Sequence, residues 1–108
     1  MLVAPKSSGK FTMNMDLDCE YRNAETAYML GHYGEAAAII DLLTANFPDN
    51  PRLHLFRGYI YNYGLQEYEI ARQEYELVLA LAPEDVELIN TVLQEIIYVE
   101  NLLKSRED

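Results

Sequence analysis

The chain has 108 residues, 50% of them hydrophobic, and its 18 acidic and 8 basic residues give a formal net charge of -10. This length suits one domain with a modest core, and the hydrophobic content excludes a disordered tail. The scattered Lys and Arg residues exclude a nucleic-acid binder, so a neutral or basic protein partner is expected. The single cysteine, Cys19, rules out an internal disulfide and favours a reducing, cytoplasmic location.

Residues 1–15, MLVAPKSSGKFTMNM, combine Pro, Ser, Gly and Lys with scattered hydrophobics and show no period. They predict a flexible N-terminal tail without the pattern of a signal peptide. The remaining residues, 16–108, are expected to form the domain. None of its apolar runs approaches the roughly 20 residues that a membrane-spanning helix needs.

The first predicted helix pair begins with DCEYRNAETAYML, in which Ala24, Ala27 and Tyr28 lie on one helical face. Gly31 is expected to end this helix in a left-handed conformation. The second helix follows in GHYGEAAAIIDLLTANFPDN, where the apolar stripe uses spacings of three and four residues. The prolines at 48 and 51 separate this pair from the next one.

The second predicted pair begins with RLHLFRGYIYNY, where Pro51 suits a first helical turn and Gly58 a helix crossing. Gly64 is expected just beyond the end of the helix. Tyr59, Tyr61 and Tyr63 alternate as in a strand, but the flanking helical period favours a helix.

The segment LQEYEIARQEYELVLALAPED repeats the stripe of the second helix 35 residues later. The matched pairs are Tyr33 and Tyr68, Ala36 and Ala71, Ile40 and Tyr75, Leu43 and Val78, and Pro48 and Pro83. Five matches at one offset indicate an internal repeat.

The last predicted helix spans 84–104 and carries one apolar side that is expected to cover the preceding repeat. Its members are Val86, Ile89, Val92, Leu93, Ile96, and Val99 or Leu103.

These residues resemble the tetratricopeptide repeat (TPR) family, whose unit is a helix-turn-helix of about 34 residues. The resemblance implies an all-α fold, a short right-handed α-solenoid of two repeats and a C-terminal capping helix. Repeat one is expected at 17–50, repeat two at 51–85 and the capping helix at 84–104. Glu20 and Asn23 depart from the family pattern, and one extra residue near YGLQEY predicts a wider turn in repeat two.

The sequence lacks a pattern for catalysis, so we expect no enzyme activity and no cofactor. The Gly-Lys of APKSSGKFT lacks the rest of a phosphate-binding loop. His32 and His54 have no ligand at metal-binding spacing and are expected in turn and surface roles. Cys19 has no identifiable base and is expected to be passive.

In the family that the chain resembles, the first helix of each repeat lines a concave groove that binds a partner. The resemblance places two sets of residues from the repeats in this groove, Tyr21, Arg22, Glu25, Tyr28 and Met29, then Arg52, Leu55, Phe56, Tyr59, Asn62 and Tyr63. The capping helix would add Asn90, Thr91, Gln94 and Tyr98. Tyr59 and Tyr63 are expected to be exposed there, and Tyr61 and Tyr75 to lie in the core.

Large aromatic side chains with polar tips are favoured at protein interfaces. The expected function is therefore a scaffold or adaptor module that holds a neutral or basic segment of another protein in a tyrosine-rich groove. A self-associating assembly factor or chaperone-like protein is the alternative. The segment from Phe56 to Leu81 is also similar to N-terminal repeats of cyanobacterial chemoreceptor-like and pilus-motility signalling proteins, which implies a signalling context.

Overall fold

The computed structural model describes residues 16–107, so the tail expected at 1–15 lies outside the described residues. Every regular element in the described range is helical, which confirms the all-α prediction and shows that a strand at Tyr59 to Tyr63 is wrong. The elements are α2 (Leu17–Met29), α3 (Tyr33–Asn46), α4 (Pro51–Tyr59), the π-helix η1 (Ile60–Gly64), α5 (Tyr68–Leu81) and α6 (Val86–Glu107).

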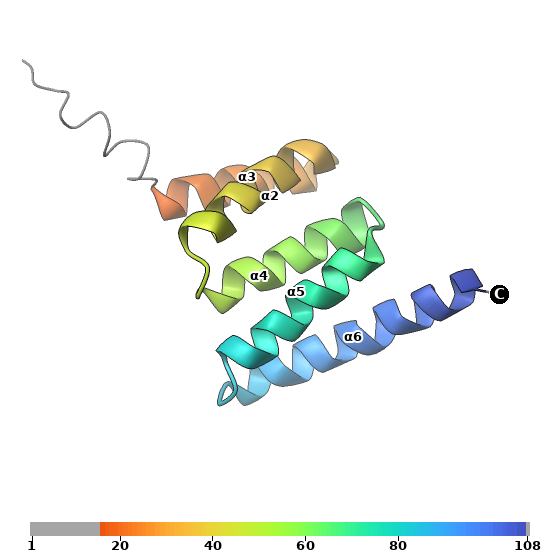
Figure 1. The fold of residues 1–108 in the computed structure, drawn as a ribbon. Coiled ribbons are helices and arrows are strands. Elements are labelled where there is room, and N and C mark those ends of the chain that lie inside the picture. The colour runs from red at the N-terminus through yellow and green to blue at the C-terminus, as the bar shows by residue number, and fades with distance from the viewer. Residues whose placement is uncertain (1–15, 108) are drawn as a thin grey trace, which may run out of the picture.

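The helices stack as neighbours in chain order (Figure 1). Helix α2 packs against α3, α4 packs against α5, and α6 packs against α5. The contacts between α3 and α4 join the two pairs. We call α2 with α3 the first helix pair, and α4, η1 and α5 the second helix pair.

The ends of the first helix follow from its sequence. The side chain of Asp16 accepts a hydrogen bond from the backbone N–H of Cys19 and caps the N-terminus. Gly31 has a φ of +81°, and the N–H of His32 donates to the carbonyl of Ala27. The expected left-handed glycine at the end of α2 is confirmed.

The second helices of the two pairs have equivalent ends, as the spacing of 35 residues predicts. Phe47 after α3 has φ -130° and ψ 66°, and Ala82 after α5 has φ -132° and ψ 61°. The apolar stripe is fully buried in both helices, at Ala36, Ile40, Leu43, Ala71, Tyr75 and Val78.

The extra residue of the second pair lies inside its first helix. The two N-caps, Asp16 and Asn50, are 34 residues apart, whereas α3 and α5 begin 35 residues apart. Five residues of η1 take up the difference as a π-helical turn, in which the N–H of Leu65 donates to the carbonyl of Ile60. The predicted wider turn is therefore wrong, because residues 30–32 and 65–67 form connections of equal length.

Two glycines of the second pair allow close helix contacts. A Cβ at Gly58 would lie 2.3 Å from Cε1 of Tyr75, so only glycine fits this crossing. A Cβ at Gly64 would lie 2.7 Å from Cδ1 of Tyr33. Gly58 lies at a crossing as expected, but Gly64 is the last residue of η1 rather than a residue beyond the helix end.

Helix α6 buries part of the predicted stripe, because Val92 and Val99 are fully buried and Ile96 packs against the same core. Leu88, Val92 and Val99 are buried against the second pair, whereas Val86 and Leu93 are 69% and 44% exposed. The prediction that Val86 and Leu93 belong to the core is wrong, because α6 carries two apolar stripes and the core uses the one through Leu88. Asp85 caps the helix by accepting from the N–H of Leu88, so the helix begins at Val86 and ends at Glu107.

A buried polar cluster joins α3, α4 and α5. Glu74, which is 5% exposed, accepts hydrogen bonds from Nδ1 of His54 at 2.7 Å and from the Arg57 guanidinium at 2.6 Å. Nε2 of His54 lies 2.7 Å from the carbonyl oxygen of Pro48, and Arg57 also donates to Asp41. The expectation of a surface role for His54 is wrong, because its side chain holds the turn before α4 against α5.

The same cluster extends to η1. The Tyr61 hydroxyl donates to the Asp41 carboxylate, and the Arg57 guanidinium lies 4.9 Å from the centre of the Tyr61 ring. Burial would lower the pKa of Arg57, but its hydrogen bond to Asp41 and the charges of Glu74 and Asp41 raise the pKa above its ordinary value. Tyr61 is only partly buried, whereas Tyr75 lies in the core as predicted.

Candidate functional site

A row of tyrosine side chains crosses one side of the molecule from α2 through α4 and η1 to α6. We call it the tyrosine face, and its members are Tyr21, Tyr28, Tyr59, Tyr63 and Tyr98. Tyr63 and Tyr98 are each 46% exposed, and the other three are partly buried. The face therefore combines rings fixed by packing with rings that are open to solvent.

Ring contacts connect the helices that contribute to the tyrosine face. Phe56 lies beneath it, with ring centroids 5.1 Å from Tyr21 and 5.7 Å from Tyr28. At the other end, Tyr63 lies 6.1 Å from Tyr59 and stacks on Tyr98 at 5.8 Å with an interplanar angle of 21°. Such contacts hold the rings in place, so little side-chain entropy remains to be lost on binding.

The carboxylate of Glu95 lies among these rings. Its Oε1 accepts a hydrogen bond of 2.6 Å from the Tyr63 hydroxyl and a longer one of 3.5 Å from Nδ2 of Asn62. Within residues 16–107, no Lys or Arg lies within ion-pair distance of Glu95. The aromatic row thus surrounds a negative charge that the protein does not neutralise with a cation.

Four hydroxyls of the tyrosine face are held in their neutral form. Burial raises the pKa of Tyr21, Tyr28, Tyr59 and Tyr63 above the ordinary value of 10.0. The negative charge of Glu95 raises the pKa of Tyr28, Tyr59 and Tyr63 further. At Tyr63 the hydrogen bond to Glu95 also raises the pKa. The face therefore offers hydroxyl groups that can donate or accept hydrogen bonds.

Two small hollows flank the start of α4 on the same side. One of about 250 Å³ lies between α4 and α6 and is lined by Arg52, Leu55, Tyr59 and Thr91, together with the acidic start of α6. The other, of about 230 Å³, lies between α2 and α4 and is lined by Tyr21, Arg52 and Leu53 among others. Arg52 belongs to both, so it marks the polar end of the tyrosine face.

The predicted groove residues fall into three groups. Tyr21, Tyr28, Arg52, Tyr59, Tyr63 and Tyr98 come together on the tyrosine face and its hollows. Two others, Phe56 and Asn62, are only 7% and 2% exposed, so they support the face from beneath. Oδ1 of Asn62 has no hydrogen-bond partner, while its Nδ2 donates to the Tyr75 hydroxyl.

Leu55 is partly buried in the α4–α6 hollow, and the remaining predicted residues are exposed, some of them away from the face. Arg22 lines a hollow with Asp18, Asn23 and Thr26 on the outer side of α2. Asn90 lies on the outward stripe of α6 because it follows Val86 by four residues and precedes Leu93 by three. Glu25 and Gln94 are exposed at the rim, where neither makes a hydrogen bond to another described side chain.

The sequence interpretation missed Glu95, which accepts a hydrogen bond from Tyr63 on the face. A signal for it was present, because Thr91, Glu95 and Tyr98 follow one another at spacings of four and three. The polar cluster around Glu74 was also missed, although His54, Arg57 and Tyr61 have the same helical spacing.

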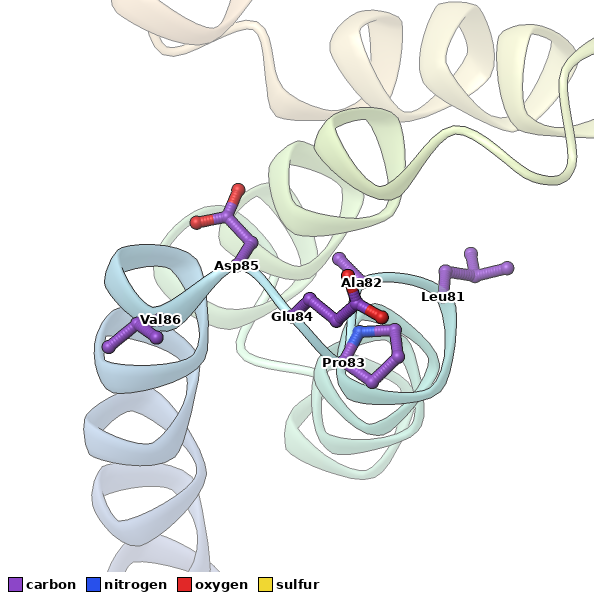
Figure 2. A pocket seen from close by; sticks show the side chains of 6 residues that line it. All are labelled: Leu81, Ala82, Pro83, Glu84, Asp85 and Val86. Atoms are coloured by element: carbon purple, nitrogen blue, oxygen red, sulfur yellow. The ribbon is translucent and has the colours of Figure 1, made fainter.

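A hollow at the turn between α5 and α6 does not have the form of a binding site. It has a volume of about 850 Å³ and is lined only by the consecutive residues 81–86 of the turn between α5 and α6. Figure 2 shows that these side chains all come from one short segment, with Leu81 and Val86 at its two ends. A ligand there would meet no groups converging from other helices.

The described residues contain no group of three or more His, Cys, Asp or Glu side chains that could hold a metal ion. Cys19 is a free, exposed thiol. Between residues 16 and 107, none of the helices has both the length and the apolar character required to cross a membrane.

Comparisons of the chain with family models, with curated proteins and with solved structures find no match.

Proposed function

We propose that this chain is a short tetratricopeptide-type helical repeat that binds a neutral or basic segment of another protein on its tyrosine face. The observation that carries the proposal is the row of contacting tyrosine rings around the unpaired carboxylate of Glu95. The repeat assignment is supported by the equal ends of α3 and α5 and by their matching buried stripes.

The chemistry of the face favours a protein ligand. Tyrosines supply large apolar areas with hydrogen-bonding tips, and rings held by their neighbours bind at a low entropic cost. Glu95 favours a segment that carries a Lys or Arg side chain, since a cation can contact the carboxylate and the surrounding ring faces together. The net charge of -10 attracts such a segment at long range.

The proposal is tested by substituting residues of the face that do not hold the fold together. The partner is first purified on the immobilised chain, identified by mass spectrometry and prepared separately. Its Kd is then measured by calorimetry for the Tyr98→Ala, Glu95→Gln and Leu77→Ala variants. Leu77 is the matched control, because it is a large apolar residue of similar exposure, 42%, but lies on α5.

We expect Tyr98→Ala and Glu95→Gln each to weaken binding by about tenfold or more, which is typical of residues near the centre of an interface. Leu77→Ala should bind as the parent chain does. Unchanged affinity in both face variants would contradict the proposal, whereas a loss confined to Leu77→Ala would place the partner on α5.

A further inference from the structure

Helix α6 presents a second apolar stripe on the side that faces away from the core. Its exposed members are Val86, Leu93 and Ile97, with exposed fractions of 69%, 44% and 59%. The buried stripe of α6 runs through Leu88, Val92 and Val99 instead. The outward stripe therefore lies on the last helix with nothing packed against it among the described residues.

The outward stripe continues in polar residues with the same spacing. The stripe has six positions, all exposed, and neighbouring positions are separated by four, three, four, three and four residues. They are Val86, Asn90, Leu93, Ile97, Glu100 and Lys104. Alternating intervals of this kind form the contact seam of a two-helix coiled coil.

The order of residues along this stripe is complementary to itself in the antiparallel direction. When two copies of α6 run antiparallel about a twofold axis near Glu95, Leu93 of each copy meets Ile97 of the other. Asn90 then meets Glu100, so that an amide can donate to a carboxylate on either side of the apolar centre. Val86 meets Lys104, whose aliphatic stem can cover it.

Charge at the helix ends favours the same arrangement. The first turn of α6 is acidic, with Glu87, and its last turn is basic, with Lys104 and Arg106. In an antiparallel pair each acidic start lies beside the basic end of the other helix, and the helix dipoles oppose each other favourably. A parallel pair would place Glu100 beside Glu100 and Lys104 beside Lys104.

We propose that a second copy of this chain binds to the outward stripe of α6 and forms an antiparallel, twofold dimer. The contact from Val86 to Lys104 is about 27 Å long, which puts the interface among the small, transient ones. The tyrosine face stays open in this dimer, because Tyr98 and Glu95 do not belong to the outward stripe. Two such faces in one dimer would bind a partner with repeated sites more tightly than one.

The dimer is tested by sedimentation of the whole chain at chain concentrations from about 10 μM to about 1 mM, the range expected for so small an interface. Salt of about 0.15 M limits the repulsion between two acidic copies. The parent chain should pass from monomer to dimer over this range. A monomer at every concentration would overturn the proposal.

A double variant, Leu93→Glu with Ile97→Glu, should remain monomeric at all these concentrations while its circular dichroism is unchanged. The matched control is Leu42→Glu with Leu77→Glu, which adds the same charge at exposed apolar residues of α3 and α5. The control should still dimerise. Persistence of the dimer in the α6 variant would overturn the proposal, as would equal loss in the control.

The register is tested at one position with opposite charges. Asn90→Lys should tighten the dimer by on the order of tenfold, since the introduced lysine of each copy would meet Glu100 of the other. Asn90→Glu should weaken the dimer for the opposite reason. Gln73→Lys, which makes the same charge change on exposed α5 surface, should have a smaller effect than Asn90→Lys. Weakening by Asn90→Lys would contradict the antiparallel register.

Discussion

The first and second helix pairs fill the same interior space with different residues. Ala24 of α2 and Ile40 of α3 are both fully buried in the first pair. The equivalent positions in the second pair hold Gly58 and Tyr75, and the tyrosine ring takes the place of the missing Cβ. A larger residue on one helix is thus compensated by a smaller residue on the helix packed against it. The two pairs therefore bury equivalent positions, but the residue types at these positions differ.

The pairs also differ in their polar content and in their turns. The interior of the first pair is mostly alanine and aliphatic, whereas the second contains Glu74 bound to His54 and Arg57. Both turns use a left-handed residue, but the first has Gly31 and the second has Gln66, with a φ of +59°. Glycine adopts this conformation without strain and glutamine does not.

The largest expected effect comes from removing the buried charge of the second pair. Glu74→Ile introduces the residue type that the first pair has at the equivalent position, Ile39, but removes the buried carboxylate that Arg57 and His54 share. We expect the free energy of unfolding to fall by about 3–5 kcal/mol in urea titrations. Glu69→Ala, which breaks an exposed pair with Arg72, should cost less than about 1 kcal/mol. Equal effects of the two changes would contradict the structural role of Glu74.

The second test replaces Gly58 and Tyr75 of the second pair by the residue types that the first pair has at these positions, alanine and isoleucine. Gly58→Ala should destabilise the protein by about 1–3 kcal/mol, because the new Cβ would overlap the Tyr75 ring. Adding Tyr75→Ile should recover part of this loss, with a coupling of at least about 1 kcal/mol in a double-mutant cycle. Additive losses would show that the two residues do not compensate each other.

The third test uses the tyrosine that only the second pair contains in its core. Burial raises the pKa of Tyr75 above 10.0, so folding favours its protonated form. Its contribution is complete below pH 10 and decreases above it, because the unfolded chain then loses a proton that the folded chain keeps. The free energy of unfolding then falls by about 1.4 kcal/mol per pH unit for one tyrosine.

Urea titrations between about pH 9 and pH 11 should therefore give a shallower alkaline loss for Tyr75→Phe than for the parent chain. The slope of the unfolding free energy against pH should differ between the two proteins by an amount that approaches the uptake or release of one proton. Identical slopes would mean that Tyr75 ionises as easily in the folded protein as in the unfolded chain.

The smallest expected effect is at the two turns. Gln66→Gly should stabilise the protein by about 0.5–1 kcal/mol, because it removes the strain of a left-handed glutamine. Gly31→Gln should destabilise it by a similar amount, although the space beside Gly31 is open. Thermal unfolding of both variants measures the difference, and a destabilised Gln66→Gly would contradict the equivalence of the turns.

Most of the helical architecture could be predicted from the sequence. The stripe of Ala36, Ile40 and Leu43 and the glycine at 31 have local signals that depend on spacing and turn chemistry. The π-helical turn had no such signal: an extra residue can enter a turn or a helix, and the contact of Gly64 with Tyr33 is tertiary. The orientation of α6 was predictable only in part: Val92 and Val99 are buried as expected, but Val86 and Leu93 belong to a second apolar stripe that is exposed.

The candidate site was predictable in part. The family resemblance placed Tyr59, Tyr63 and Tyr98 in one groove, helical spacing supported Tyr59 and Tyr63, and the structure brings the three rings together. Spacing alone did not show that Phe56 and Asn62 are covered by neighbouring helices, nor that Glu95 lies among the rings. The burial of Phe56 depends on how α2 packs on α4, and the position of Glu95 depends on how α6 packs on the second pair, so both are decided by long-range packing.

The most direct test of partner binding on the tyrosine face is site-specific photo-crosslinking. A photoreactive amino acid is placed at Thr91, which is exposed beside the α4–α6 hollow, and in a matched variant at Ala80, which is exposed on α5. With the purified partner, we predict crosslinks from position 91 to a segment containing Lys or Arg and none from position 80. Crosslinks from position 80 alone would contradict the proposed site.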